Sequence, residues 1–194
     1  LVSSGGRAAG TAVETSGLAS IAAGGVLTGL TVGSGGTAVI AGTLENGVVS
    51  SGGKLEFQNG CVLSGTLEVG GGEVTTPGPV SVAAGTKLRL SLDWQICAGE
   101  VTVLGSLDDF AGAAFSLKVK DLDYQGYYHL SELRSADPGL SMTVFDGEGQ
   151  SLGAVTVGGG SLRTGDYFYT LFNQNSGVWF CISEAADPAP YGKV

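Results

Sequence analysis

The sequence contains one histidine, His129, and its neighbours decide what chemistry it could support. A hydrolytic triad brings a serine or cysteine nucleophile, a histidine base and a carboxylate together. No serine or cysteine near His129 has a spacing that suggests such a triad, and one histidine excludes a metal site built from several histidines. Because Tyr127 and Tyr128 precede it in a strand-like run, we interpret His129 as a packed or surface residue.

Two acidic segments have the spacing of incomplete metal sites. Asp121 and Asp123 would lie on one face of a strand, and Asp146-Gly147-Glu148-Gly149 resembles part of a calcium loop. The further ligands and closing glutamate of an EF-hand are missing, as is the Gly-Gly-x-Gly-x-Asp phrase of calcium-binding β-rolls. We therefore expect a hairpin turn at 146–149 and no metal site.

The other carboxylates do not predict an acid–base pair. Asp108 and Asp109 are neighbours that a strand would point to opposite faces, and we expect them to open a short turn. Glu45 and Glu68 follow a Thr-Leu pair at comparable places of a repeat, so they could line up as an acidic ladder, although like charges stacked closely repel. We interpret both as solvated corner residues and predict no catalytic residue.

The cysteines and glycine runs do not predict a cofactor. Cys61, Cys97 and Cys181 have no CxxC spacing, which argues against a zinc ribbon or a redox motif. Cys97 and Cys181 are the more plausible disulfide pair because they lie in the same half, and three free buried thiols are the alternative. No helix is expected after the glycines at 70–72 or 158–160, so neither run predicts a phosphate cradle.

Charge and aromatic content restrict the partners. A net charge of -9 and a pI near 4.4 argue against nucleic acid, because phosphate binding needs clustered lysine and arginine. The aromatic residues suit either a sugar-stacking platform or, as the stronger interpretation, the core of the second half and a cover for one end of the fold. They are Trp94, Tyr124, Tyr127, Tyr128, Tyr167, Tyr169, Trp179 and Tyr191.

A repeated glycine phrase organises the elements that would hold these residues. Ser34-Gly35-Gly36 and Ser50-Ser51-Gly52-Gly53 are its clearest copies, and it returns at steps of roughly 11 to 19 residues. Between copies, segments such as Lys54-Leu55-Glu56-Phe57 alternate with period 2, which predicts short strands. Short strands between tight glycine corners are typical of a parallel β-solenoid, here with about four or five coils over residues 1–92.

Period 2 also predicts which side chains face the solenoid core. Thr, Ser and Glu residues would alternate with them on the outside. The expected inward residues are Val13, Leu30, Val32, Val39, Leu44, Val48, Leu55, Phe57, Val62, Leu67, Val69, Val74 and Val80.

The composition changes after Leu92. Of the 15 aromatic residues 14 lie beyond it, and longer candidate strands occur there with hairpin-type turns between them, which favours antiparallel pairing. These strands are expected at 101–104, 115–119, 126–130, 140–145, 152–157, 167–172 and 178–182. We divide the chain into a solenoid (1–92), an aromatic β segment that caps or extends it (93–183) and a linker or frayed end (184–194). No signal peptide or membrane helix is visible.

The glycine phrases with intervening Thr-x-Val/Leu units resemble the AIDA-type repeats of bacterial autotransporter adhesins. Residues 2–6, 33–39, 43–53 and 66–72 carry this resemblance, which covers roughly the first 90 residues. It implies a right-handed parallel β-helix from the passenger of a surface protein, extracellular or associated with the outer membrane, with further repeats in its parent chain. A membrane barrel is not encoded here. The resemblance transfers no catalytic residue.

The expected function is accordingly a non-enzymatic module of a bacterial cell-surface or secreted protein, used for adhesion or as a structural stalk. Its partner would be a host or microbial surface glycan or protein, without nucleic acid or membrane insertion. A carbohydrate-binding module is the alternative. A polysaccharide hydrolase or lyase on a β-helix ranks last, because the repeats carry few carboxylates.

Overall fold

The computed structural model describes residues 1–92, 104–120, 125–133, 139–175 and 177–186, and within these ranges the chain is almost entirely β. The strands of the first half are β1 (Arg7–Val13), β2 (Leu18–Ile21), β3 (Val26–Val32), β4 (Thr37–Ile40), β5 (Thr43–Ser50), β6 (Lys54–Phe57), β7 (Val62–Gly70), β8 (Glu73–Thr75), β9 (Ser81–Val82) and β10 (Lys87–Leu92). Those of the second half are β11 (Leu104–Ser106), β12 (Ala114–Val119), β13 (Gly126–Leu133), β14 (Ser141–Phe145), β15 (Ser151–Thr156), β16 (Leu162–Thr164), β17 (Tyr167–Gln174) and β18 (Gly177–Ser183).

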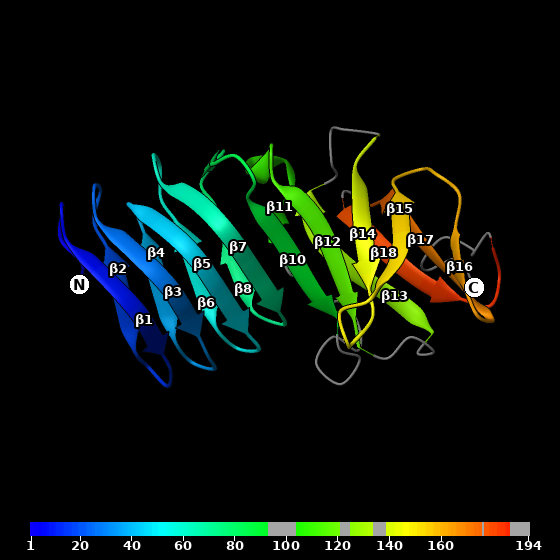
Figure 1. Ribbon diagram of the computed structural model, residues 1–194, viewed down its shortest axis with the longest axis horizontal. Coiled ribbons are helices and arrows are strands. Elements are labelled where there is room, and N and C mark those ends of the chain that lie inside the picture. The colour runs from blue at the N-terminus through cyan, green and yellow to red at the C-terminus, as the bar shows by residue number, and fades with distance from the viewer. Residues whose placement is uncertain (93–103, 121–124, 134–138, 176, 187–194) are drawn as a thin grey trace.

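Two nine-stranded sheets run along the long axis of the molecule and enclose its core (Figure 1). The front sheet has the order β1-β3-β5-β7-β10-β12-β14-β15, and β9 pairs with β7 beside this path. The back sheet has the order β16-β17-β18-β13-β11-β8-β6-β4-β2. Odd and even strands from β1 to β8 thus alternate between the sheets, and each pairs in parallel with its counterpart one coil later. This confirms the predicted parallel β-solenoid.

The first four coils are short and nearly equal in length. Arg7 pairs with Val26, Val26 with Thr43, and Thr43 with Val62. The first and last of these offsets along the chain are equal, and the middle one is slightly smaller. The pairs β1–β2, β3–β4, β5–β6 and β7–β8 form these coils. Their number agrees with the four or five coils expected from the glycine phrases.

The two glycines of each phrase meet different requirements of a stacked corner. Gly35 has φ of 74°, a left-handed conformation that side chains with a Cβ rarely adopt. Gly36 follows without space for a Cβ, which would lie 2.2 Å from the carbonyl oxygen of Val13 in the preceding coil. The Gly35 amide also donates a hydrogen bond of 2.9 Å to the Gly52 carbonyl of the next corner. The phrase therefore encodes corners that lie directly on one another.

The core confirms most of the predicted inward residues and corrects three of them. Val39 and Val62 are only half-buried, and Val48 is 41% exposed. The alternation breaks where the chain bends: Leu44 and Val49 are both fully buried, although strict alternation would point them to opposite faces. Asn46 causes this break in β5, because its φ of 61° turns a corner inside the strand.

The solenoid continues beyond Leu92, with longer coils. Lys87 pairs in parallel with Ala114, and Leu104 with Ser131, and both offsets along the chain exceed that from Arg7 to Val26. Parallel pairing of β12 with β14 extends the front sheet again. Antiparallel hairpins do form at two of the expected turns, between β14 and β15 and between β17 and β18, whereas β11 and β12 occur near their expected places but join the parallel ladders. The expected strand 101–104 lies mostly outside the described residues.

Among the described strands, antiparallel pairs occur at the C-terminal end. β15 folds back on β14, while β18 pairs with both β13 and β17, and β16, which the sequence pattern did not predict, pairs with β17. Tyr128 and Tyr169 pack their rings on Phe180 with centroids 6.3 and 5.6 Å apart inside this end. The aromatic segment thus first extends and then caps the solenoid. No described helix is long and apolar enough to cross a membrane.

Candidate functional site

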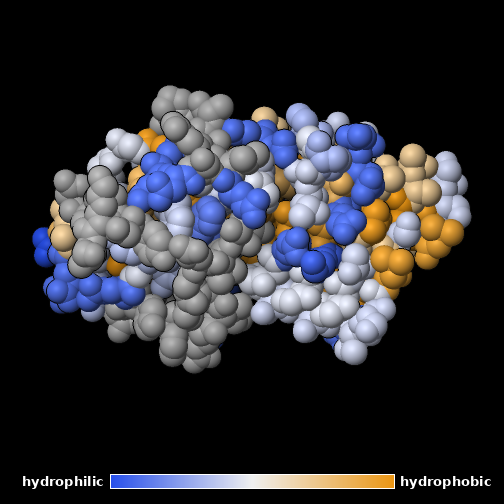
Figure 2. All heavy atoms as spheres, turned by 180° about the vertical axis from the view of Figure 1, so that it is seen from behind, coloured by the Kyte–Doolittle hydropathy of each residue, from blue (hydrophilic) through white to orange (hydrophobic). Residues whose placement is uncertain are grey.

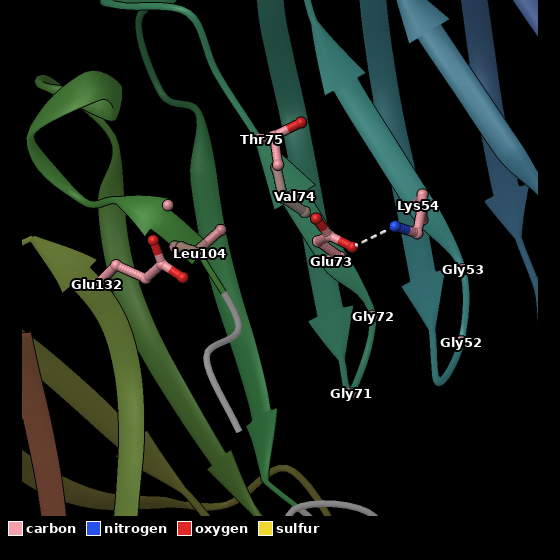
Figure 3. Close-up of a pocket in the computed structure, with 11 residues that line it drawn as sticks. Gly52, Gly53, Lys54, Gly71, Gly72, Glu73, Val74, Thr75, Leu104 and Glu132 are labelled. Atoms are coloured by element: carbon pink, nitrogen blue, oxygen red, sulfur yellow. Dashed lines mark ion pairs between the residues drawn. The ribbon is translucent and has the colours of Figure 1, made fainter. Parts of the chain in front are cut away.

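A hollow of about 420 Å³ opens on the outer face of the back sheet, where β6, β8, β11 and β13 lie side by side (Figure 3). Leu104 pairs with Val74 on one side and Ser131 on the other, so Gly105 lies between Thr75 and Glu132. Because Gly105 has no side chain, the sheet surface is lowered there. Lys54 and Glu73 border the hollow on the side of the earlier coils.

The charged side chains of this hollow are an exposed ion pair, Lys54 with Glu73, and the exposed carboxylate of Glu132. Lys54 Nζ lies 2.8 Å from Glu73 Oε2, and the hydrogen bond and charge of Glu73 raise the pKa of Lys54. Both side chains are more than half exposed, and solvent screens such a pair strongly. Glu132 and Thr75 add a carboxylate and a hydroxyl, both exposed. The hollow can accept hydrogen bonds from sugar hydroxyls, but within the described residues no three His, Cys, Asp or Glu side chains gather as metal ligands.

The two glutamates that could have formed an acidic ladder do not stack on each other. Glu45 lies before the corner at Asn46 and pairs with Thr28 and Ser64, whereas Glu68 lies after the equivalent corner at Gly65 and pairs with Arg89. Thr28 Oγ1 donates a 2.9 Å hydrogen bond to Glu45 Oε2. Both carboxylates therefore bind neighbours on adjacent coils, and the ladder alternative is wrong.

The aspartate segments form turns, as expected. Asp108 and Asp109 open the 3-10 helix η1 (Asp108–Phe110), in which Asp109 accepts a hydrogen bond from Thr76 and Phe110 packs edge-on against Phe57 at 5.8 Å. Asp146 begins the hairpin between β14 and β15, and its carboxylate accepts a 2.7 Å hydrogen bond from the Gln150 amide. The segment with Asp121 and Asp123 lies outside the described residues.

His129 belongs to an aromatic cluster on the outer face of the back sheet. Its ring stacks on Trp179 with centroids 4.4 Å apart and planes 7° apart, and beside this pair Tyr127 meets Phe172 edge-on at 6.3 Å. Trp179 is 4% exposed, and its Nε1 donates a 3.0 Å hydrogen bond to the Gln174 carbonyl. His129 is therefore packed on Trp179 at the sheet surface. Phe172 was not among the expected aromatic candidates, although period 2 in β17 places it opposite Trp179 on the same face.

The described aromatic residues follow the stronger of the two interpretations, in which they pack the core of the second half. Tyr128 and Tyr169 are buried in the core, and Tyr167 packs against it. Trp94, Tyr124 and Tyr191 lie outside the described residues. Among the described candidates only Tyr127 is both half-buried and directed outward, so they do not form a flat, open platform.

Two thiols are buried and free. Cys61 lies in the core at a corner of the early coils, and Cys181 lies beneath the outer aromatic cluster next to Tyr127. Burial raises the pKa of both thiols, which keeps them protonated and unreactive at neutral pH. Cys97, the partner predicted for Cys181, lies outside the described residues.

Known proteins do not supply a family for this arrangement. No protein-family model, curated protein or solved structure matches the chain. What can be concluded about function therefore depends on the solenoid, its two outer faces and its aromatic end.

Proposed function

We propose that the chain is a non-enzymatic module of a bacterial cell-surface or secreted protein that serves as a stalk or presents an adhesive surface. The observation that carries the proposal is the continuous stacking of parallel coils from β1 to β14. Each coil hydrogen-bonds to the next along its strands and at its corners. Such a scaffold is rigid along its axis and offers long outer faces for contact.

The outer polar side chains support this role because many of them connect coils. Ser91 Oγ donates a 2.8 Å hydrogen bond to Glu68, and Lys54 pairs with Glu73 of the following coil. Both carboxylates are already bound to partners on adjacent coils, unlike the paired acid and base of a glycoside hydrolase. The enzyme alternative accordingly ranks below the scaffold.

The N-terminal end favours a stalk with further coils of its own kind. β1 and β2 are the outermost strands of their sheets, and Leu18 on β2 is 70% exposed. Hydrophobic side chains gather at this end of the molecule in Figure 2. Val2 already pairs in parallel with Ile21, at the same offset along the chain as Arg7 with Val26. Another parallel coil would pair with the open edges of β1 and β2.

A direct test uses beads coated with the purified chain. On the proposed role, coated beads adhere to immobilised glycans or cell surfaces more than albumin-coated beads do. Incubation of the chain with acidic and neutral polysaccharides releases no reducing ends. Product release that disappears in Glu132→Gln but not in Arg7→Gln would instead identify an enzyme and overturn the non-enzymatic role.

A further inference from the structure

The basic residues are distributed unevenly over this acidic protein. The chain has nine lysines and arginines against 18 acidic residues, yet Lys87, Arg89, Lys118 and Lys120 all lie on β10, on β12 or directly after β12. These two strands are neighbours in the front sheet. Clustered like charges on one surface create a local positive potential even where the net charge is negative.

A hollow of about 340 Å³ lies among these residues. It is lined by Glu68, Gly70, Ser91, Leu92, Lys118, Lys120 and Gly147. Ser91 on β10 lies between Lys118 on β12 and Gly70 on β7. Because Ser91 and Gly70 are small, they leave a depression beside the Lys118 side chain. On the side of the hollow away from Gly70, the β14–β15 turn places Gly147 against Lys120.

The charges of the hollow are only partly neutralised. Glu68 is balanced by Arg89, whose Nη1 lies 3.6 Å from its carboxylate, and by the Ser91 hydroxyl. Lys118 is half-buried, and its ammonium has no ion-pair or hydrogen-bond partner in the described part of the chain, in contrast to Lys54 with Glu73. A partly buried cation without a partner is costly unless an anion binds it.

An aromatic ring adjoins the cations. Phe145 pairs with Lys118 in the neighbouring strand, is half-buried, and carries the Arg89 guanidinium 5.6 Å from its ring centroid. An aromatic ring gives an apolar surface on which the C–H face of a pyranose can pack. Cations, a hydroxyl and an aromatic ring on one open surface are thus suited to an acidic sugar.

We propose that this hollow binds an acidic polysaccharide through the carboxylate or sulfate groups of its sugars. Lys118 and Lys120 contact the acidic group, Ser91 Oγ accepts a hydrogen bond from a sugar hydroxyl while its own proton stays on Glu68, and Phe145 packs on the ring. The site would operate whether the module is a stalk or an adhesive tip, so its failure would leave the stalk proposal standing.

The test measures binding of the full chain to four polymers by titration calorimetry. Oligogalacturonate supplies carboxylates, dextran sulfate supplies sulfates, dextran is the neutral control, and poly-glutamate supplies carboxylates without sugars. We expect saturable binding to one or both acidic polysaccharides that weakens with added salt, and none to dextran. Preference between the first two identifies the acidic group.

Matched variants locate the site. Lys118→Gln should weaken the binding roughly tenfold, whereas Arg7→Gln removes the same charge from exposed Arg7 on β1 of the same sheet and should change it less than about twofold. Circular dichroism checks that both variants fold. Equal weakening by the two variants, equal binding of poly-glutamate, or no binding of either acidic polysaccharide would overturn the proposal.

Discussion

The early and late coils of this solenoid share one backbone ladder but have different corners. The first coils are short and turn at glycines that lie against the coil below, while the later ones are longer and carry inserted segments such as η1. At these short corners even a Cβ would clash with the neighbouring coil, so they cannot carry the side chains of a binding site. We therefore propose that the early coils serve mainly as scaffold, and that the late coils contribute the cations of the basic hollow and the aromatic cluster.

The two regions also bury different side chains. Leucine, isoleucine, valine and alanine fill the early coils, with Phe57 as the only aromatic residue before Leu92. Tyr128, Tyr169 and Phe180 close the late end. Because a solenoid exposes the core of its last coil, the late region protects the early one.

Removing the late region should have the largest effect. A chain that ends at Leu92 would lose β12, which covers β10 with its buried Leu88 and Leu90. We expect it to aggregate or to melt without cooperativity, as measured by size-exclusion chromatography and thermal denaturation. A soluble monomer with a sharp melt would show that the short coils need no cover.

Truncating one aromatic side chain of the late core should have the next largest effect. Phe180→Ala removes a fully buried ring and should lower the free energy of unfolding by about 3–5 kcal/mol in urea titration. Phe172→Ala removes a half-buried ring on the outer face of the same sheet and is the control. Equal losses in the two variants would contradict the division into a core face and an outer face.

A methyl group at an early corner should cost somewhat less. Gly36→Ala places a Cβ against the Val13 carbonyl and should lower the free energy of unfolding by about 2–3 kcal/mol. Gly160→Ala, where a Cβ meets no atom within 4 Å, should change it by less than about 0.5 kcal/mol. If both variants unfold at the same urea concentration, close stacking of the corners does not contribute to the stability of the early coils.

The smallest effect should be the pH dependence of the free energy of unfolding that arises from two buried thiols, Cys61 in the early region and Cys181 in the late one. Burial raises the pKa of Cys61 and Cys181 above the ordinary 9.0, so the folded chain keeps protons that the unfolded chain releases. Stability should therefore be unaffected by the thiols below about pH 9 and fall above it, by at most about 1.4 kcal/mol per pH unit for each thiol. The raised pKa of Tyr127 adds to the loss above pH 10.

Urea titrations at pH 8 and pH 10 check this prediction. A double variant, Cys61→Ala with Cys181→Ala, should lose less stability between these pH values than the original chain. The same loss in both proteins would exclude the thiols as its cause.

The sequence predicts the early region better than the late one. Glycine pairs between period-2 segments are a local signal, and they are sufficient for the parallel coils. The corner at Asn46 is less visible, because a single non-glycine residue with positive φ changes which side chains face inward; Val48 was misplaced for this reason. The same corner separates Glu45 from Glu68.

The late region depends on contacts between distant residues. Hairpin-type turns after Leu92 favour antiparallel pairing, but β12 pairs in parallel with β10 and β14, which are both distant from it along the chain. The basic hollow likewise forms only when Gly70, Ser91 and Lys118 come together from three coils. Sequence spacing does not reveal such a site, because each residue alone resembles an ordinary surface position.

The most direct test of a single continuous solenoid compares two probes of urea unfolding. Trp179 is buried in the late region and both tryptophans follow Leu92 in the sequence, so tryptophan fluorescence is the probe for the late region and far-UV circular dichroism the probe for all strands. If the late region caps one continuous core, the two transitions coincide, and Gly36→Ala in the early coils shifts both by the same amount. Separate transitions, or a fluorescence midpoint that Gly36→Ala leaves unchanged, would contradict this account.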